Sequence, residues 1–190
     1  MKQRSLFLAG GVLVLAPVLA WAGPEVNTVP SQWAGLYAGA QLGLNQSNAY
    51  DLDTRTSLTG GVSAGYNVAL PISTAPAPVI VGGDVFAEFN GQSTHNRDVT
   101  YGSNVVGVDL LAGYPVGLGR RLLPYLKVGL GDVSATGDLS NSNTSARIGL
   151  GAQYRLGPDL AAQAQWMHQD AGHISNDNFT VGLNYQFSLQ

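Results

Sequence analysis

The residues best suited to covalent chemistry stand near the end of the chain, where His173-Ile174-Ser175-Asn176 places an imidazole two positions before a hydroxyl. Ester hydrolysis requires an activated serine, a base, and usually an acid that orients the base. No Asp or Glu follows Asp177, and the stretch is rich in Ser, Asn and Asp, where such tetrapeptides arise by chance. A short motif without its context is a weak basis for a function. The sequence therefore favours a protein without catalytic residues.

A second set of reactive side chains lies in VGGDVFAEFNG, residues 81–91. Successive side chains of a β-strand point to opposite faces. Asp84 and Glu88 therefore share one face with Phe86, while Val85 and Phe89 lie on the other. The stretch predicts a strand with one apolar and one acidic face.

Period-two alternation continues along most of the chain. Eight segments show it, separated by polar or turn residues: 35–45, 58–70, 79–90, 104–116, 122–131, 146–156, 160–168 and 178–187. Eight strands joined consecutively predict an all-β, antiparallel, up-and-down barrel, which closes the sheet and leaves no edge.

Glycine indicates which face of each strand points inward. Many glycines stand on the polar face: Gly39, Gly43, Gly61, Gly65, Gly107, Gly113, Gly129, Gly149, Gly151 and Gly182. A crowded eight-stranded interior has room for such residues, whereas an outer face would gain nothing from them. The polar faces are thus predicted to line the lumen and the apolar faces to contact lipid. A soluble secreted barrel that binds an apolar ligand is the alternative.

Aromatic residues on the apolar faces support lipid contact. If the N-terminus starts in the periplasm, one group lies near the periplasmic strand ends and another near the outer ends, as the two membrane interfaces favour. The predicted interface residues are Tyr66, Tyr114, Tyr154, Tyr185 and Phe187, and Phe89, Trp166 and Phe179. The polar segments 46–57, 91–103, 132–145 and 169–177 are predicted extracellular loops. Residues 71–78, with three prolines, form an unusually long periplasmic turn.

With polar faces inward, charged residues meet inside the barrel. The predicted lumen network comprises Asp84, Glu88, Asp109, Lys127, Arg147 and Arg155. Isolated charges are costly in such an interior, so the three acids and three bases should pair and plug the lumen. At most, small ions could pass if the pairs exchange partners.

The N-terminus has the parts of a secretory signal peptide: Lys2 and Arg4, a short apolar run, and Ala20-Trp21-Ala22. We expect residues 1–22 to be removed, leaving a periplasmic lead at 23–34, a barrel at 35–187 and an extension at 188–190. Cleavage changes the formal charge from −3 to −5, which argues against nucleic acid. The chain has no cysteine. No cofactor or metal is expected, since His95, His168 and His173 show no ligand spacing and are predicted to be solvated.

The alternating segments resemble the small outer-membrane β-barrel family that includes opacity-type surface proteins and outer-membrane immunogenic proteins. The matching stretches are WAGLYAGAQLGL (33–44), GGVSAGYNV (60–68), VGGDVFAEF (81–89), LLPYLKVGLG (122–131), ARIGLGAQYRL (146–156) and NFTVGLNYQF (178–187). The resemblance implies a Gram-negative outer-membrane barrel, in contact with membrane lipid and lipopolysaccharide, whose loops could meet an extracellular partner.

The resemblance bears on two further features. Phe187 resembles the terminal aromatic that the barrel-assembly machinery recognises, although Ser188-Leu189-Gln190 follow it. His173-Ile174-Ser175-Asn176 resembles a sequence of outer-membrane lipid A deacylases, which are similar eight-stranded barrels. An enzyme of that type is therefore the alternative to a structural or surface-interacting protein.

Overall fold

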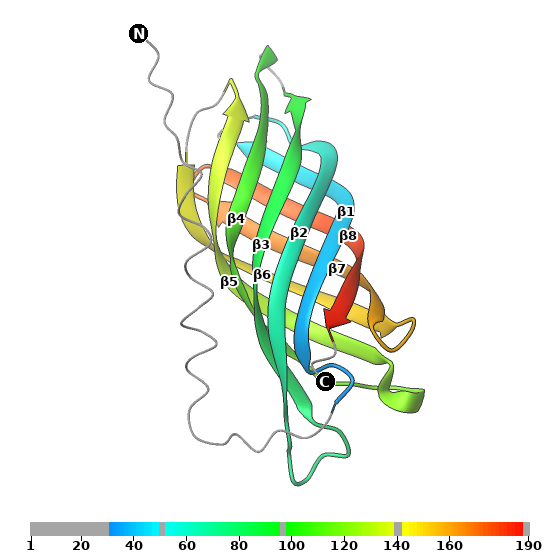
Figure 1. The fold of residues 1–190 in the computed structure, drawn as a ribbon. Helices are drawn as coiled ribbons and strands as arrows, with labels where there is room; N and C mark the ends of the chain where they lie inside the picture. Colours follow the sequence, from blue (N-terminus) through cyan, green and yellow to red (C-terminus); the bar gives the residue numbers. More distant parts are fainter. Residues whose placement is uncertain (1–30, 50–51, 96–97, 139–141, 188–190) are drawn as a thin grey trace.

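The alternating segments pair in sequence order into one closed antiparallel barrel (Figure 1). This computed structural model describes residues 31–49, 52–95, 98–138 and 142–187. The predicted signal peptide, most of the predicted lead and the extension 188–190 lie outside these ranges. The strands are β1 (Gly35–Ala49), β2 (Arg55–Leu70), β3 (Val79–Thr94), β4 (Thr100–Gly113), β5 (Leu122–Gly137), β6 (Ser142–Arg155), β7 (Leu160–Ala171) and β8 (Ile174–Phe187). The predicted fold class is confirmed.

Closure depends on the pairing of the first and last strands. The β1–β8 ladder runs from Leu36 opposite Phe187 to Ala49 opposite Ile174. We call the end where β1 begins and β8 ends the lower end, as it lies in Figure 1, and the opposite end the upper end. Within the described residues, no helix is long and apolar enough to cross a membrane.

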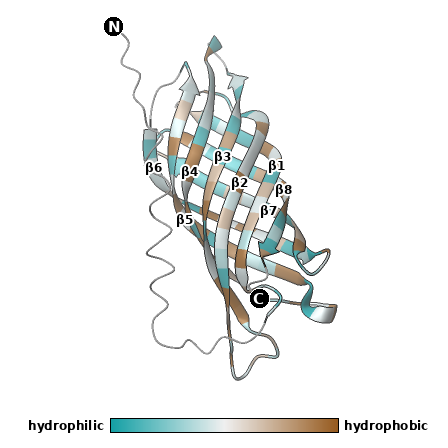
Figure 2. Cartoon of the chain, in the orientation of Figure 1, coloured by the Kyte–Doolittle hydropathy of each residue, from teal (hydrophilic) through white to brown (hydrophobic). Residues whose placement is uncertain are grey.

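The strands reach further toward the upper end than the sequence predicted. β3 continues to Thr94 and β5 to Gly137, and β4 and β6 begin at Thr100 and Ser142. Most of the predicted loops 46–57, 91–103, 132–145 and 169–177 are therefore strand, and that prediction was wrong. The ladders continue there while the apolar alternation fades, because strands that extend past the lipid have no apolar face to bury. Figure 2 shows hydrophilic residues at the upper strand tips.

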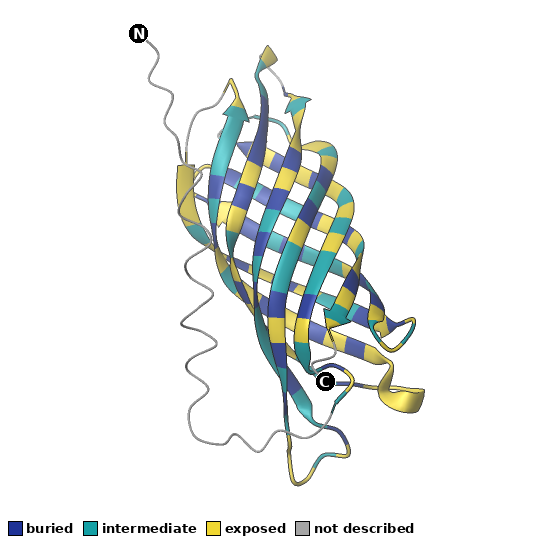
Figure 3. Cartoon of the chain, viewed as in Figure 1, coloured by how far each residue is buried: buried dark blue, intermediate teal, exposed yellow. Residues whose placement is uncertain are grey.

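Burial alternates along each strand, as Figure 3 shows. In β8, Asn178, Thr180 and Asn184 are buried, whereas Phe179, Val181 and Leu183 are exposed on the outer wall. A soluble barrel would show the reverse pattern, with apolar side chains inside. The pattern agrees with an outer wall that faces lipid.

Trp33 closes the lower end of the lumen. Its side chain is fully buried and packs in an apolar layer, which we call the lower apolar layer: Trp33, Ala69, Ile80, Leu111, Leu123, Tyr125 and Ala161. The indole Nε1 donates a hydrogen bond of 2.9 Å to the carbonyl of Arg120, in the β4–β5 connection. Gln32 donates to the carbonyls of Gly119 (3.0 Å) and Arg120 (2.7 Å). These bonds tie the segment before β1 across the barrel end.

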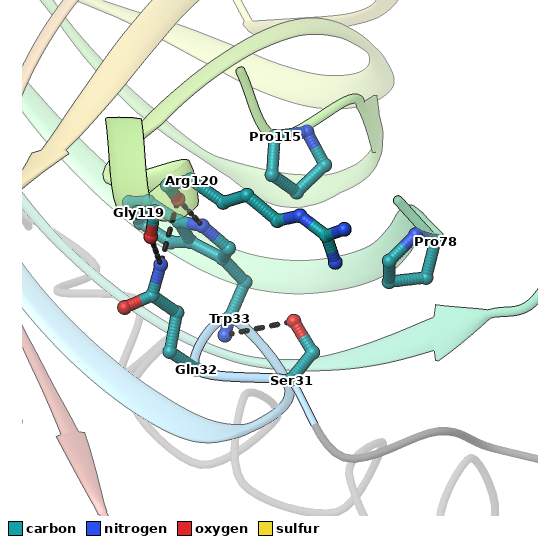
Figure 4. Close-up of a pocket in the computed structure, with 7 residues that line it drawn as sticks. All are labelled: Ser31, Gln32, Trp33, Pro78, Pro115, Gly119 and Arg120. Atoms are coloured by element: carbon teal, nitrogen blue, oxygen red, sulfur yellow. Dashed lines mark hydrogen bonds between the residues drawn. The ribbon is translucent and has the colours of Figure 1, made fainter. Parts of the chain in front are cut away.

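A shallow pocket of about 210 Å³ lies beside Trp33 (Figure 4). Pro78 and Pro115 form part of its wall, and Arg120 reaches across it to donate a hydrogen bond to the carbonyl of Pro76. The proline-rich 71–78 segment thus connects β2 to β3 beside the Trp33 seal. Its contact with Arg120 gives this long turn a structural partner that the sequence did not indicate.

We predict that Trp33→Ala destabilises the barrel by about 3–5 kcal/mol, because removing a large buried aromatic side chain leaves a cavity. The measurement is the urea midpoint of the folded form in detergent, followed by the gel shift between folded and boiled protein. Trp166→Ala is the control and should cost less, because lipid or detergent can fill the space on the outer wall. Equal midpoints for wild type and Trp33→Ala would show that Trp33 is not a seal.

Candidate functional site

Five of the six charged side chains predicted for the lumen meet in one buried group, which we call the lumen cluster. Asp84 and Glu88 come from β3, Asp109 from β4, Lys127 from β5 and Arg147 from β6. Their side chains retain 0–8 % of their accessible surface. Strand alternation brings them together, since each stands on the inward face of a neighbouring strand.

Glu88 and Arg147 form the most complete pair of the cluster. Arg147 donates from Nη2 to Glu88 Oε1 at 2.8 Å and from Nη1 to Oε2 at 3.1 Å. This bidentate geometry is the strongest arrangement of a guanidinium with a carboxylate. Asn178 and Gln41 add hydrogen bonds to the same carboxylate, at 3.0 and 3.3 Å. The Arg147 guanidinium also stacks 3.8 Å above the centre of the Phe86 ring.

Asp84 and Asp109 share the remaining cation, Lys127. Lys127 Nζ lies 2.6 Å from Asp84 Oδ2 and 3.6 Å from Asp109 Oδ2. Tyr37 donates a second hydrogen bond of 2.6 Å to Asp84 Oδ2. Asp109 also lies 3.2 Å from Arg147 Nε. Asp109 therefore connects the two pairs into one cluster.

Gly129 gives Asp109 the space it occupies. Gly129 stands opposite Asp109 on β4 and opposite Arg147 on β6. A Cβ at Gly129 would lie 2.1 Å from Asp109 Oδ1 and 2.3 Å from the Val108 carbonyl oxygen. Any side chain here would displace the carboxylate that bridges the cluster. Lumen glycines thus have a specific role, which is to accept neighbouring side chains across the interior.

Arg155 does not join the network, contrary to the prediction. It stands eight residues from Arg147 on β6, roughly 26 Å along the strand at about 3.3 Å per residue. Its guanidinium donates to the Pro158 carbonyl at 2.5 Å and to Gln186 Oε1, and lies 4.8 Å from the centre of the Trp33 ring. Arg155 therefore helps Trp33 to close the lower end of the barrel instead of joining the lumen cluster. The cluster contains three acids and two bases, rather than three of each.

Apolar side chains lie on both sides of the lumen cluster. The lower apolar layer includes Leu111 and Leu123, on the same strands as Asp109 and Lys127. An upper apolar layer consists of Ala49, Phe86, Tyr101, Val105, Val133, Ala171 and Ile174. Phe86 and Val105 of the upper group lie at the level of the charges, since Val105 stands opposite Glu88 and Arg147 stacks on Phe86. The charged group is thus packed among apolar side chains, with buried polar residues such as Asn45 and Asn176 above it.

Uncharged polar residues complete the network, and the sequence analysis did not single them out. Gln41 Oε1 accepts hydrogen bonds from Gln165 (2.8 Å), Gln163 (3.0 Å) and Thr180 (3.3 Å). With Tyr37 and Asn178, these side chains surround the cluster. The same alternation that located the charges places them inward, so the signal was present in the sequence. Uncharged amides and hydroxyls carry no charge that must be paired, so the pairing argument that located the acids and bases did not extend to them.

The eight aromatic residues predicted to lie at the membrane interfaces occupy three different settings. Tyr66, Phe89, Tyr154, Phe179, Tyr185 and Phe187 are exposed. Trp166 is half-buried and stands directly opposite Phe179. Tyr114 lies beyond the end of β4 at Gly113, so the predicted strand 104–116 was too long at that end. Contact with β5 nevertheless continues past Gly113, because Tyr114 N donates 3.2 Å to the Pro124 carbonyl and Val116 forms an isolated bridge with Leu122. The chain turns only afterwards, where Gly117 and Gly119 adopt positive φ angles in and before a 3-10 turn, η2 (Leu118–Arg120).

The histidines occupy three different settings. His95 is buried rather than solvated, because its ring stacks on Tyr101 with centroids 4.4 Å apart and hydrogen-bonds the Asp53 carbonyl at 2.6 Å. His168 lies on the outer wall between Asp177 and Asp170, at 3.0 and 3.2 Å. His173 lies in the β7–β8 turn. No group of three His, Cys, Asp or Glu side chains within the described residues could hold a metal ion.

Ser175 lies at the upper end, directly opposite Asp170 across the β7–β8 hairpin. Its described side-chain contact is a hydrogen bond to Asp170. The Asp170 carboxylate in turn contacts His168 Nε2. In this order the carboxylate, not the imidazole, is next to the hydroxyl. A serine nucleophile needs the base beside it, with the acid behind the base, so His168 does not occupy the position of a base for Ser175.

The closed barrel, its apolar wall and its filled polar lumen define a class of membrane protein. Residues 7–187 match the family described as the outer membrane protein beta-barrel domain. The chain belongs to this family and is an outer-membrane β-barrel protein. No curated protein sequence matches the chain.

Solved structures with the same fold include three at a TM-score above 0.5. Neisserial surface protein A has a TM-score of 0.58 and 17% identity, over 81% of this chain and 98% of that one. OprG from Pseudomonas aeruginosa has 0.53 and 11%, over 83% and 99%. The outer membrane enzyme PagL has 0.52 and 13%, over 80% and 99%. At these identities the likeness concerns the fold, which supports proteins with and without enzymatic activity.

We predict that Arg147→Met destabilises the barrel by about 3–5 kcal/mol, because it leaves Glu88 buried without its cation. The measurement is the urea midpoint in detergent. Arg55→Met is the matched control: Arg55 pairs with Asp53 at 2.6 Å, but its side chain is 51% exposed, so the loss should stay below about 1 kcal/mol. Similar losses in both variants would argue against a special role for the buried pair.

Proposed function

We propose that this protein is a non-enzymatic structural barrel of the outer membrane, with a plugged lumen and an upper rim that contacts other surface molecules. The observation that carries the proposal is the buried lumen cluster, which fills the barrel interior together with the apolar side chains packed against it. Eight strands leave an interior just wide enough for side chains to fill. The paired charged side chains fill the cross-section of the barrel, so the interior acts as a packed core.

The upper rim supports the surface role. Polar residues of β1, β7 and β8 stand above the level of Trp166 and Phe179, and Trp166 Nε1 donates 3.1 Å to Asp177. Asn48, His168, Asp170, Ser175 and Asp177 gather on this part of the wall. Aromatic girdles mark the membrane interfaces, so these side chains would lie at the level of lipopolysaccharide sugars and phosphates. We infer contact with that lipid, and with an extracellular partner of unidentified chemistry.

The two ends of the chain carry the signals that we propose for export and for assembly in the membrane. Residues 1–22 act as a signal peptide that is removed, and the lower end faces the periplasm. Phe187, the last residue of β8, is the aromatic that the barrel-assembly machinery recognises. The position of Phe187 supports this role, because it pairs with Leu36 at the first rung of the β1–β8 ladder. The seam that closes the barrel therefore carries this residue.

In planar bilayers, the wild-type barrel should show no stable large conductance, only small and infrequent events. Lys127→Glu should produce frequent cation-conducting events, because four acids would then face one base and the interior would have to hydrate. It should also lower the temperature at which the folded form is lost on a gel. Arg55→Glu makes the same charge reversal at the rim and should leave the conductance unchanged.

Two results would contradict the plug. One is a wild type that conducts like a general porin. The other is a Lys127→Glu barrel identical to wild type in both conductance and heat stability, which would mean that these side chains do not close the lumen.

The enzyme alternative predicts deacylation. Purified wild-type protein mixed with lipid A in detergent should release no fatty acid above the level of a boiled sample, measured by mass spectrometry. Release that disappears in Ser175→Ala but persists in Ser145→Ala, a serine whose hydroxyl hydrogen-bonds Gln169, would overturn the non-enzymatic proposal.

A further inference from the structure

The lumen cluster has one more acid than it has bases. Asp84, Glu88 and Asp109 face Lys127 and Arg147, and Arg155 bonds elsewhere. All five side chains are at least nine-tenths buried. Three carboxylates and two cations would leave a net charge of −1 in the middle of the barrel. Burying an uncompensated charge is strongly unfavourable, so the group needs one more positive charge.

The hydrogen bonds show which carboxylates carry the excess negative charge. Both oxygens of Glu88 accept hydrogen bonds from Arg147. Asp84 Oδ2 accepts from Tyr37 and Lys127, whereas its buried Oδ1 has no hydrogen-bond partner among the described residues. Asp109 Oδ1 lies 3.2 Å from Arg147 Nε and Oδ2 lies 3.6 Å from Lys127 Nζ, but neither ion-pair contact is a hydrogen bond. The unfilled acceptors belong to Asp84 and Asp109.

These two acids stand directly opposite each other on β3 and β4. Like charges in that position repel, and two carboxyl groups that share a site tend to retain a proton between them. The charged and titratable groups around the pair come from several strands: Tyr37 on β1, Glu88 on β3, Tyr125 and Lys127 on β5, and Arg147 on β6. β2 presents only Gly61 and Gly65 opposite Glu88 and Asp84.

We propose that the lumen cluster binds one proton, held by the Asp84–Asp109 pair at neutral pH. The proton balances the charge, and a protonated Asp109 gains a donor that can fill an empty acceptor of its partner. A metal ion fits less well, because no three-ligand group that could hold one occurs within the described residues. A proton also needs no hydration shell in this buried interior. The barrel core is therefore a proton-binding site.

The test is infrared spectroscopy of the folded protein in detergent at pH 7, recorded in H2O and D2O. A protonated carboxyl group gives a C=O stretch that carboxylates lack, and that band shifts in D2O. We expect one such band in wild type. It should disappear in Asp109→Asn and in Asp84→Asn, since either variant leaves two acids and two bases. Asp132→Asn, which removes a carboxylate that accepts bonds from Ser142 and Thr144 at the upper end, should retain it.

Each variant is first shown to be folded by its gel shift on boiling, so that a lost band reports protonation. A wild type without the band would overturn the proposal, as would a band that survives in both Asp109→Asn and Asp84→Asn. A further arm replaces sodium and potassium with tetramethylammonium. An absent band, together with lower heat stability in tetramethylammonium, would assign the missing charge to an alkali ion instead and reject the proton.

Discussion

The structure depends on one constraint: in lipid, every backbone N–H and C=O group must be paired within the protein. A sheet can meet this requirement only by closing on itself, and here β1 and β8 pair along nearly their whole length. With eight strands the interior is narrow, and whatever points inward must pack. The small residues and the pairing of charges on the inward face both follow from that closure.

The close packing of the interior also explains how charged side chains can be buried in it. Bidentate bonds pair Arg147 with Glu88, and the room that Gly129 leaves lets Asp109 approach both Arg147 and Lys127. Buried ion pairs contribute little net stability over a well-packed apolar core, although breaking one is costly. Their effect here is on specificity, because a one-residue slip of any strand would move its charge from the lumen to the lipid.

Much of this arrangement was predictable from the sequence, because period-two alternation is a local property. Val181, Leu183 and Tyr185 alternate with Thr180 and Asn184, which fixed both the strand and its orientation. The same rule placed Asp84 and Lys127 in one lumen. The sequence also held the reason why Arg155 lies apart, since eight residues of one strand separate it from Arg147 by roughly 26 Å, although the predicted network counted both. His95 was also missed, because its stacking on Tyr101 joins residues across a hairpin. Where β3 and β5 pass beyond the lipid, the alternation itself is lost.

Trp33 has a consequence for the order in which the barrel can form. It stands two residues before β1, yet its indole bonds Arg120, in the connection between β4 and β5, and its ring lies under Arg155 at the end of β6. The seal at the lower end therefore cannot form while only the first strands are in place. Until these distant segments meet, the lower mouth stays open and the Trp33 side chain stays uncovered, and both are protected only in the closed barrel.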